Sequence, residues 1–254
     1  MTYCLAIKVR SGIVGISDTR ITSGQETTQA KKVFTINKEK HSFFIMTSGL
    51  RSVRDKALTY FKEIIEESDE DFNKLYKAVN AFALQVKRAA HEDKQALREA
   101  GLNFNLNAIV GGQLEDDEDH KIYLLYPEGN WVEITEGSRF VIIGNKGYGK
   151  PILDRAIKFD SSLKFALKAG FLSFDATRIS ANDVEYPIDL VYYAKDSFNI
   201  IEKRYRKDEL SKISRLWNTK LSESIDNLPD EWLDKLINGH VDVEDSITEE
   251  MNFD

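Results

Sequence analysis

The chain has 254 residues and a formal net charge of −7, with 42% hydrophobic and 30% charged residues, a balance typical of a globular protein with a sizeable core. It has no run of about 18 apolar residues, so no transmembrane helix is expected. Because Lys8 and Arg10 lie near its start, no cleavable secretory signal is expected either. The single cysteine, Cys4, excludes an intramolecular disulfide, and these features together predict a cytoplasmic protein.

The first hundred residues predict strands followed by a pair of helices. Short apolar runs bounded by polar turns predict strands at 3–9, 12–18, 33–36 and 43–47. Apolar residues then recur every three or four positions, which predicts helices at about 50–67 and 72–100. The first two strands flank the turn Ser11-Gly12, so they are expected to form a hairpin.

The pattern repeats in the second half of the chain. Strands are expected at 107–112, 121–126, 131–134, 140–143, 188–194 and 198–203, and helices near 149–158, 161–171 and 207–222. Blocks of hairpin strands alternating with blocks of helices favour an α+β domain, in which helices cover antiparallel sheets, over a doubly wound parallel sheet. Because no linker rich in Pro, Gly or Ser divides the body, we expect one domain at 1–225 and an extension at 226–254.

The C-terminal extension carries most of the negative charge. Residues 226–254 contain ten acidic side chains and one basic side chain, whereas the residues before them carry a net charge of about +2. The sequence contains no cluster of basic residues, so binding to nucleic acid is not predicted. The extension is interpreted either as a solvated terminus or as a contact arm, because a short apolar stripe occurs at Trp232, Leu233, Leu236 and Ile237.

The sequence begins with Met1-Thr2, and Thr2 leads directly into the first predicted strand. Methionine is readily trimmed before a residue as small as threonine. Trimming would leave Thr2 with a hydroxyl that can attack and an α-amine that can accept its proton. The α-amine has an ordinary pKa of about 7.7–8, so it can act as a general base near neutral pH. Thr2 is therefore a candidate nucleophile.

Three further features could complete such a site. Asp18 ends the second strand, and the hairpin would bring it close to Thr2; a lysine of the pair Lys31-Lys32 could lower the cost of forming an alkoxide. Gly49 lies where a strand gives way to a helix, a position suited to an oxyanion-binding N–H group. Each also has a structural alternative, since the aspartate could cap a turn, the lysines could be solvated and the glycine could simply start a helix.

Taken together, these residues resemble one known family. The motifs at Thr2, 17–20, 30–36 and 46–50 are similar to the N-terminal half of a proteasome β-subunit. Within that superfamily the start Met-Thr-Tyr-Cys and the segments 111–113, 126–130, 148–155, 173–175 and 187–190 resemble the Anbu branch, the bacterial "ancestral β-subunit" relatives. The resemblance extends from residue 2 to about 220.

The resemblance implies an N-terminal nucleophile hydrolase fold, a four-layer αββα sandwich of two antiparallel sheets between helical layers. It implies a self-compartmentalising threonine hydrolase that cuts peptides or another amide inside a homo-oligomeric ring or open helical array, with an ATPase partner left open. It assigns Thr2 as the nucleophile, Asp18 as the acidic partner, Lys32 as the lysine and Gly49 as the oxyanion N–H. In the family an aspartate followed three residues later by serine supports the terminal amine.

This amine-supporting pair departs from the family pattern here. Asp175 is followed by Arg178 at the expected spacing, and the serine comes five residues on, at Ser180. Asp175 and Ser180 are carried over as the candidates for this role. Because the amine-supporting groups differ, two alternatives stay open: a catalytically weak or inactive assembly protein of the same fold, and a non-proteolytic amidase.

Two other patterns carry no functional prediction. Residues 144–150 satisfy the spacing of a phosphate-binding loop, but Pro151 follows where a Ser or Thr must hold Mg²⁺, so a strand-to-helix turn is the preferred interpretation. The four histidines are scattered without a metal-binding spacing, and Cys4 is interpreted as a packed core thiol. No metal or other cofactor is expected.

Overall fold

A computed structural model describes residues 2–23, 26–68, 72–234 and 236–237. It divides the chain into two compact units, residues 1–209 and residues 210–254. The unit at 1–209 contains every strand of the described chain and four of its helices. No helix within the described ranges is both long enough and apolar enough to span a membrane.

One sheet of the larger unit is built on the N-terminal hairpin. Its antiparallel strands lie in the order β10 (Phe140–Gly144), β1 (Tyr3–Val9), β2 (Gly12–Asp18), β11 (Ile188–Ala194) and β12 (Ile200–Tyr205). Every residue of β1 and β2 is buried, which is the pattern of strands covered on both faces. The predicted hairpin is confirmed, and it forms the centre of this sheet.

The second sheet contains the strands of the middle of the chain. Its antiparallel order is β5 (Val33–Lys38), β6 (His41–Gly49), β7 (Leu106–Gln113), β8 (Lys121–Leu125) and β9 (Trp131–Glu133). A separate two-stranded ribbon, β3 (Arg20–Ser23) and β4 (Glu26–Gln29), was not predicted. Its sequence is polar and β4 is exposed throughout, so it lacks the apolar alternation that reveals a strand.

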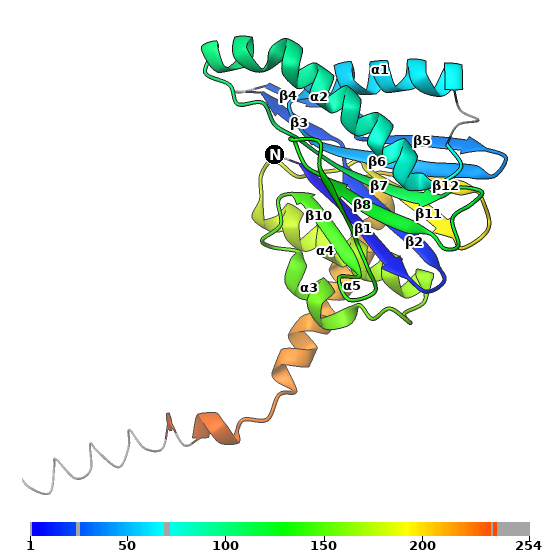
Figure 1. Ribbon diagram of the computed structural model, residues 1–254. Coiled ribbons are helices and arrows are strands. Elements are labelled where there is room, and N and C mark those ends of the chain that lie inside the picture. Colours follow the sequence, from blue (N-terminus) through cyan, green and yellow to red (C-terminus); the bar gives the residue numbers. More distant parts are fainter. Residues whose placement is uncertain (1, 24–25, 69–71, 235, 238–254) are drawn as a thin grey trace, which may run out of the picture. The chain divides into compact units, whose positions relative to one another are not determined.

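Helices cover the outer faces of the two sheets. Helices α1 (Arg51–Ser68) and α2 (Leu75–Glu99) pack on the sheet that contains β6 and β7, whereas α4 (Leu163–Ser180) packs on β1 and β2 and α3 (Lys150–Ala156) packs on α4 (Figure 1). The layers are therefore helices, sheet, sheet and helices. The predicted α+β sandwich of two antiparallel sheets between helical layers is confirmed.

Each layer boundary holds an apolar core. Phe61 and Phe82 stack edge to face where α1 and α2 meet the second sheet. Between the sheets, Cys4 and Ala6 of β1 pack among residues that include Phe44 and Met46 of β6. The alternate residues of β1 point the other way, toward α4, because neighbouring side chains of a strand face opposite sides.

Helix α4 is longer than the sequence predicted. It was expected to end near residue 171, soon after Gly170, but it begins after Ser162, whose hydroxyl accepts the N–H of Phe165, and continues to Ser180. A Cβ on Gly170 would lie only 2.9 Å from the Ile16 side chain, so this glycine is a point of close helix-to-sheet contact rather than a helix end. The residues proposed to support the terminal amine therefore lie on this helix.

The smaller unit contains most of α5 (Lys207–Asp226). The helix ends four residues beyond the predicted 207–222. Of the apolar stripe noted in the extension, Trp232, Leu236 and Ile237 are exposed. Residues 235 and 238–254 of the acidic extension lie outside the described residues, and the division at 225/226 stays a prediction.

Candidate active site

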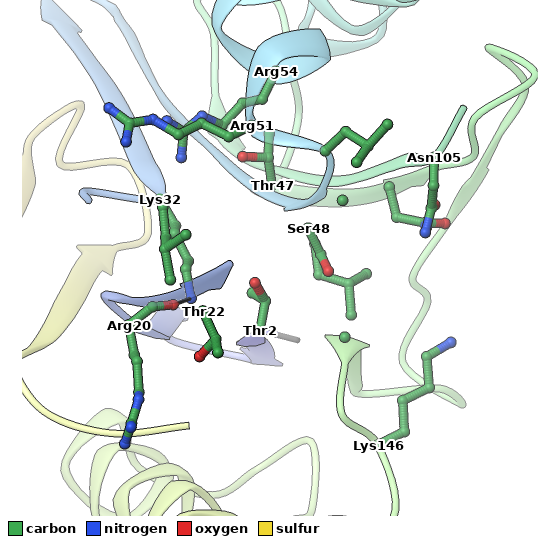
Figure 2. A pocket seen from close by; sticks show the side chains of 16 residues that line it. Thr2, Arg20, Thr22, Lys32, Thr47, Ser48, Arg51, Arg54, Asn105 and Lys146 are labelled. Atoms are coloured by element: carbon green, nitrogen blue, oxygen red, sulfur yellow. Dashed lines mark hydrogen bonds between the residues drawn. The ribbon is translucent and has the colours of Figure 1, made fainter. Parts of the chain in front are cut away.

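A pocket of about 480 Å³ opens at the N-terminal end of β1 and has Thr2 in its lining. Its walls come from six places in the sequence: the start of β1, the ribbon strand β3, the residue before β5, the junction of β6 with α1, the start of β7 and the end of β10. Figure 2 shows the Thr2 side chain in the middle of these groups. The fold thus gathers segments that are up to about 140 residues apart around the predicted nucleophile.

The backbone around Thr2 is held from two sides. Its carbonyl oxygen accepts the N–H of Asn145 at 2.7 Å, and the N–H of Tyr3 donates to Oδ1 of Asp18 at 2.8 Å. Thr2 is only 8% exposed, although it immediately precedes the first strand. The hydroxyl of this residue is therefore presented by an ordered backbone rather than by a loose terminus.

A buried ion pair lies beside the pocket. Nζ of Lys32 donates to Oδ1 of Asp18 at 2.6 Å and to the carbonyl oxygen of Arg20 at 2.7 Å. Both side chains are almost completely buried. Burial raises the pKa of the Asp18 carboxyl, and the Lys32 ammonium and the N–H groups of Tyr3 and Arg20 act in the opposite direction.

The strand register explains how this pair forms. In the β1–β2 hairpin Cys4 lies opposite Ser17, so the next residue of β2, Asp18, reaches the start of β1. Lys32 immediately precedes β5, and its carbonyl oxygen accepts the N–H of Thr47 at 3.2 Å. Lys32 lines the pocket together with Thr2, whereas the carboxylate of Asp18 lies behind the lysine and does not line the pocket.

Gly49 also lines the pocket, at the junction of β6 and α1. Its φ of +135° is in the region that favours glycine, and a Cβ on it would lie 2.1 Å from the carbonyl oxygen of Asn105. That same carbonyl accepts the N–H of Leu50 at 2.9 Å. The chain can make this close turn from strand to helix only with a glycine at the position.

The turn after β10 is a part of the site that the sequence did not reveal. Gly144 and Lys146 line the pocket, and the strand-to-helix interpretation of 144–150 is confirmed because β10 ends at Gly144 and α3 begins at Lys150. Gly144 has φ +86°, and a Cβ on it would lie 1.9 Å from the carbonyl oxygen of Thr2. The glycine was visible in the sequence, but its contact with Thr2 follows from the pairing of β10 with β1.

The substitution Gly144→Ala is expected to disturb the site directly. Its methyl group would overlap the Thr2 carbonyl, so Thr2 must move and the Asn145 hydrogen bond must lengthen. We expect covalent labelling and hydrolysis at Thr2 to fall by at least about tenfold, since small displacements of reacting groups have large effects on rate. Gly147→Ala is the matched control, because a Cβ there meets no atom within 4 Å. Equal behaviour of the two variants would contradict this assignment.

The two residues expected to support the terminal amine do not line the pocket. Asp175 is buried on α4, and its Oδ1 accepts a hydrogen bond from Arg178 at 2.8 Å. The Arg178 guanidinium also lies over the ring of Tyr186. Ser180 is exposed at the last position of α4. The arginine at the position where the family has serine thus pairs with the aspartate, and the roles of both residues stay predictions.

A different serine of α4 contacts the N-terminal strand. The Tyr3 hydroxyl donates to Oγ of Ser173 at 2.7 Å, and both side chains are fully buried. Burial raises the pKa of Tyr3, so the hydroxyl stays protonated and can keep donating. This bond ties α4 to the residue next to Thr2, and the sequence offered no signal for it beyond a serine within a helix.

Cys4 lies two residues from Thr2 but is a packed core residue, as predicted. Its side chain is fully buried between the sheets, and its Sγ donates to the carbonyl oxygen of Thr47 at 3.7 Å. Burial raises the pKa of the thiol, which removes the thiolate that a nucleophile needs. Within the described part of the chain, no three side chains of His, Cys, Asp or Glu lie together in a way that could hold a metal ion.

Comparisons with known proteins agree with this geometry. The family model described as "Proteasome subunit" matches residues 2–178, so the match begins at Thr2. An Anbu mutant from Hyphomicrobium sp. is 30% identical over 90% of this chain and 98% of its own, with a TM-score of 0.83. The structure described as "Helical Assembly of the Anbu Complex" from Pseudomonas aeruginosa is 28% identical over 89% of this chain and 97% of its own, with a TM-score of 0.84.

A third solved structure shares the fold at lower identity. Anbu (ancestral beta-subunit) from Yersinia bercovieri is 24% identical over 89% of this chain and 98% of its own, with a TM-score of 0.83. The comparison with curated protein sequences gave no match. These structures are similar to the chain over almost their whole length.

Proposed function

Because the chain belongs to the proteasome subunit family, we propose that it is an N-terminal threonine hydrolase that cleaves peptide bonds or other amides, with Thr2 as the nucleophile after removal of Met1. The observation that carries the proposal is that Thr2 lines the same pocket as Lys32, whose ammonium is held by a buried carboxylate. A buried and hydrogen-bonded lysine in the pocket of a positioned hydroxyl is one arrangement that helps to activate a nucleophile.

The chemistry needs few groups. The Thr2 hydroxyl attacks the carbonyl carbon of the amide, and its proton passes to the free α-amine of the same residue. The protonated amine then gives this proton to the leaving nitrogen, which breaks the amide bond and leaves an ester on Thr2. Water hydrolyses the ester, with the amine again accepting a proton, and the free enzyme returns.

Lys32 and Asp18 contribute to these reaction steps through electrostatics. The ammonium of Lys32 favours the negative charge that develops on the Thr2 oxygen as its proton leaves. Asp18 holds the lysine at 2.6 Å and, through the N–H of Tyr3, also fixes the residue next to the nucleophile. In this proposal Asp18 is a positioning residue, because it does not line the pocket itself.

The oxyanion of the tetrahedral intermediate would be stabilised by the N–H of Gly49. This glycine lines the pocket at the end of β6, and its unusual φ turns the chain there just before α1 begins. A backbone donor held by a strand and a helix needs no rearrangement during the reaction, which is the feature that makes such donors effective. Asp175 and Ser180 keep their proposed role near the α-amine.

We also propose that the chain assembles with copies of itself into a ring or an open helical array, with its sites facing inward. The Pseudomonas aeruginosa relative is described as a helical assembly, and this chain matches 97% of it. The exposed apolar side chains of Trp232, Leu236 and Ile237 offer a surface for such contacts. Cytoplasmic location stays a prediction from the sequence.

The first test is the N-terminus itself. We expect intact-protein mass spectrometry to show a chain that begins at Thr2, because only then does this residue carry a free α-amine. A hydroxyl-directed covalent inhibitor followed by peptide mapping is expected to label Thr2 and no other threonine. A purified protein that keeps Met1, or a label that spreads over surface hydroxyls, would contradict the proposal.

One observation favours a second candidate. Asp175 is engaged by Arg178 rather than by a serine at the same spacing, so the groups that support the amine differ from those of the family. A catalytically weak or inactive assembly protein of the same fold, or an amidase that does not act on proteins, would retain the same pocket. Labelling of Thr2 with no turnover of peptide amides would favour this candidate.

A further inference from the structure

Cationic side chains dominate the charged lining of the pocket. Among the described residues that line it, none is aspartate or glutamate and five are basic: Arg20, Lys32, Arg51, Arg54 and Lys146. The net charge of the residues before 226, which include the whole lining, is only about +2, so the pocket concentrates positive charge. Asp18 neutralises Lys32 from behind, and Asp55 pairs with Arg51 and Arg54. The excess positive charge therefore comes from Arg20, Lys146 and one of these two arginines.

Two of these cations come from the first turn of α1. Arg54 donates to Oδ1 of Asp55 from Nε at 2.8 Å and from Nη2 at 2.6 Å, and to the carbonyl oxygen of Lys31 from Nη1 at 3.3 Å. Its side chain is only 11% exposed. Arg51 makes a longer contact with the same aspartate, at 3.4 Å. One carboxylate therefore serves two guanidinium groups, which leaves one positive charge uncompensated at this wall.

The position of these arginines is unfavourable for the helix. The N-terminus of a helix carries a partial positive charge, so acidic residues stabilise the first turn and basic residues oppose it. The first turn of α1 contains no acidic residue, yet it contains Arg51 and Arg54. The helix dipole and both side chains thus add positive potential at the same wall, just beyond Gly49.

The opposite wall carries a further cation. Lys146 lies in the turn after β10 and forms no ion pair with a described residue. Figure 2 shows Thr2 between Lys146 on one side and Arg51 and Arg54 on the other, while the Arg20 guanidinium points away from the two arginines. Positive charge therefore flanks the proposed nucleophile from two directions.

We propose that this pocket selects substrates that carry a carboxylate close to the scissile amide, on the residue whose carbonyl is attacked or on its neighbour. Arg54 is the main specificity-determining residue, because three hydrogen bonds fix its guanidinium before substrate arrives, and Arg51 and Lys146 add to the positive field. The N–H groups of Arg54 that do not already donate to Asp55 or to Lys31 can form a charge-assisted hydrogen bond to a substrate carboxylate. This inference rests on the proposed function for the location of the scissile bond.

The test uses fluorogenic amide substrates that differ only in the acyl-side residue, which is Glu, Gln or Lys. We expect kcat/KM for the Glu substrate to exceed that for the Gln substrate by about tenfold and that for the Lys substrate by more, since a charge-assisted hydrogen bond is considerably stronger than a neutral one. The Glu-to-Gln ratio is expected to shrink as salt is raised, because ions screen the exposed cations.

Substitutions in the pocket can show which residues produce the preference for the Glu substrate. Arg54→Gln is expected to bring the ratio of kcat/KM for the Glu substrate to that for the Gln substrate close to one. Arg54→Lys is expected to retain part of the preference for Glu, and Lys146→Gln to reduce it moderately. Lys164→Gln, which changes an exposed lysine on α4 outside the pocket, is the control of equal charge and should leave the ratio unchanged. An unchanged ratio in Arg54→Gln would overturn the assignment to this arginine.

Binding to the Thr2→Ala protein separates this inference from the proposed function. Calorimetric titration with the Glu, Gln and Lys peptide amides is expected to give the same order of affinity, with no cleavage required. A Glu preference in binding without any hydrolysis would leave this inference standing while the hydrolase proposal fails. Hydrolysis at Thr2 with equal rates for Glu and Gln would overturn the inference alone.

Discussion

The substitution Thr2→Ala is expected to abolish amide hydrolysis and covalent labelling, with a fall in kcat of at least about 10³-fold, because removal of a catalytic nucleophile typically has effects of this size or larger. The fold should be unaffected, since the hydrogen bonds that hold this residue involve the backbone of Thr2 and of its neighbour. The measurement is steady-state hydrolysis of the best peptide amide, together with peptide mapping after the covalent inhibitor.

The conservative replacement Thr2→Ser is the matched control. It keeps the hydroxyl and the amine, so we expect labelling to persist and hydrolysis to be retained in part. Mass spectrometry must first show that Met1 is absent from both variants. If Thr2→Ala hydrolyses amides as fast as the parent protein, the nucleophile lies elsewhere and the proposed function is wrong.

The second large effect is expected from the buried ion pair. Asp18→Asn leaves the Lys32 ammonium almost fully buried without its carboxylate. Removing one partner of a buried pair typically lowers the free energy of unfolding by about 3–5 kcal/mol. Chemical denaturation measures this change, and hydrolysis is expected to fall with it because Asp18 positions both Lys32 and the N–H of Tyr3.

A double variant separates the stability effect from the catalytic effect. Asp18→Asn combined with Lys32→Met removes both charges, and we expect it to recover most of the lost stability, because two uncharged side chains avoid the burial of a lone ion. Hydrolysis should not recover, since the ammonium beside the nucleophile is absent. A double variant that regains full hydrolysis would show that the pair has only a structural role.

Local sequence patterns predicted the elements whose pattern is strong. The hairpin of 3–9 and 12–18 was predicted at its observed bounds because two apolar runs flank an obvious turn. The ribbon of β3 and β4 was missed because exposed polar strands have no apolar alternation. The end of α4 was predicted nine residues too early, near residue 171; in the structure Gly170 allows the helix to approach Ile16 closely, and the helix continues to Ser180.

The candidate site was predictable to the extent that it is local. Thr2, Asp18, Lys32 and Gly49 lie within the first fifty residues, in motifs that resemble one family, and the fold brings all four to the pocket or directly behind it. Arg54 and Lys146 were not predicted, because their approach to Thr2 depends on how a helix and a distant strand pack. Sheet register is a property of the whole fold, which a single sequence does not reveal.

The way in which Thr2 is anchored has a practical consequence for handling the protein. The Thr2 carbonyl oxygen is held by the N–H of Asn145, and the N–H of Tyr3 is held by Asp18. A peptide fused ahead of Thr2 therefore starts inside the pocket that Thr2 lines. A short flexible tag there would be present at an effective concentration in the millimolar range. Such a tag would act as a tethered competitor of substrate, and affinity tags therefore belong at the C-terminus.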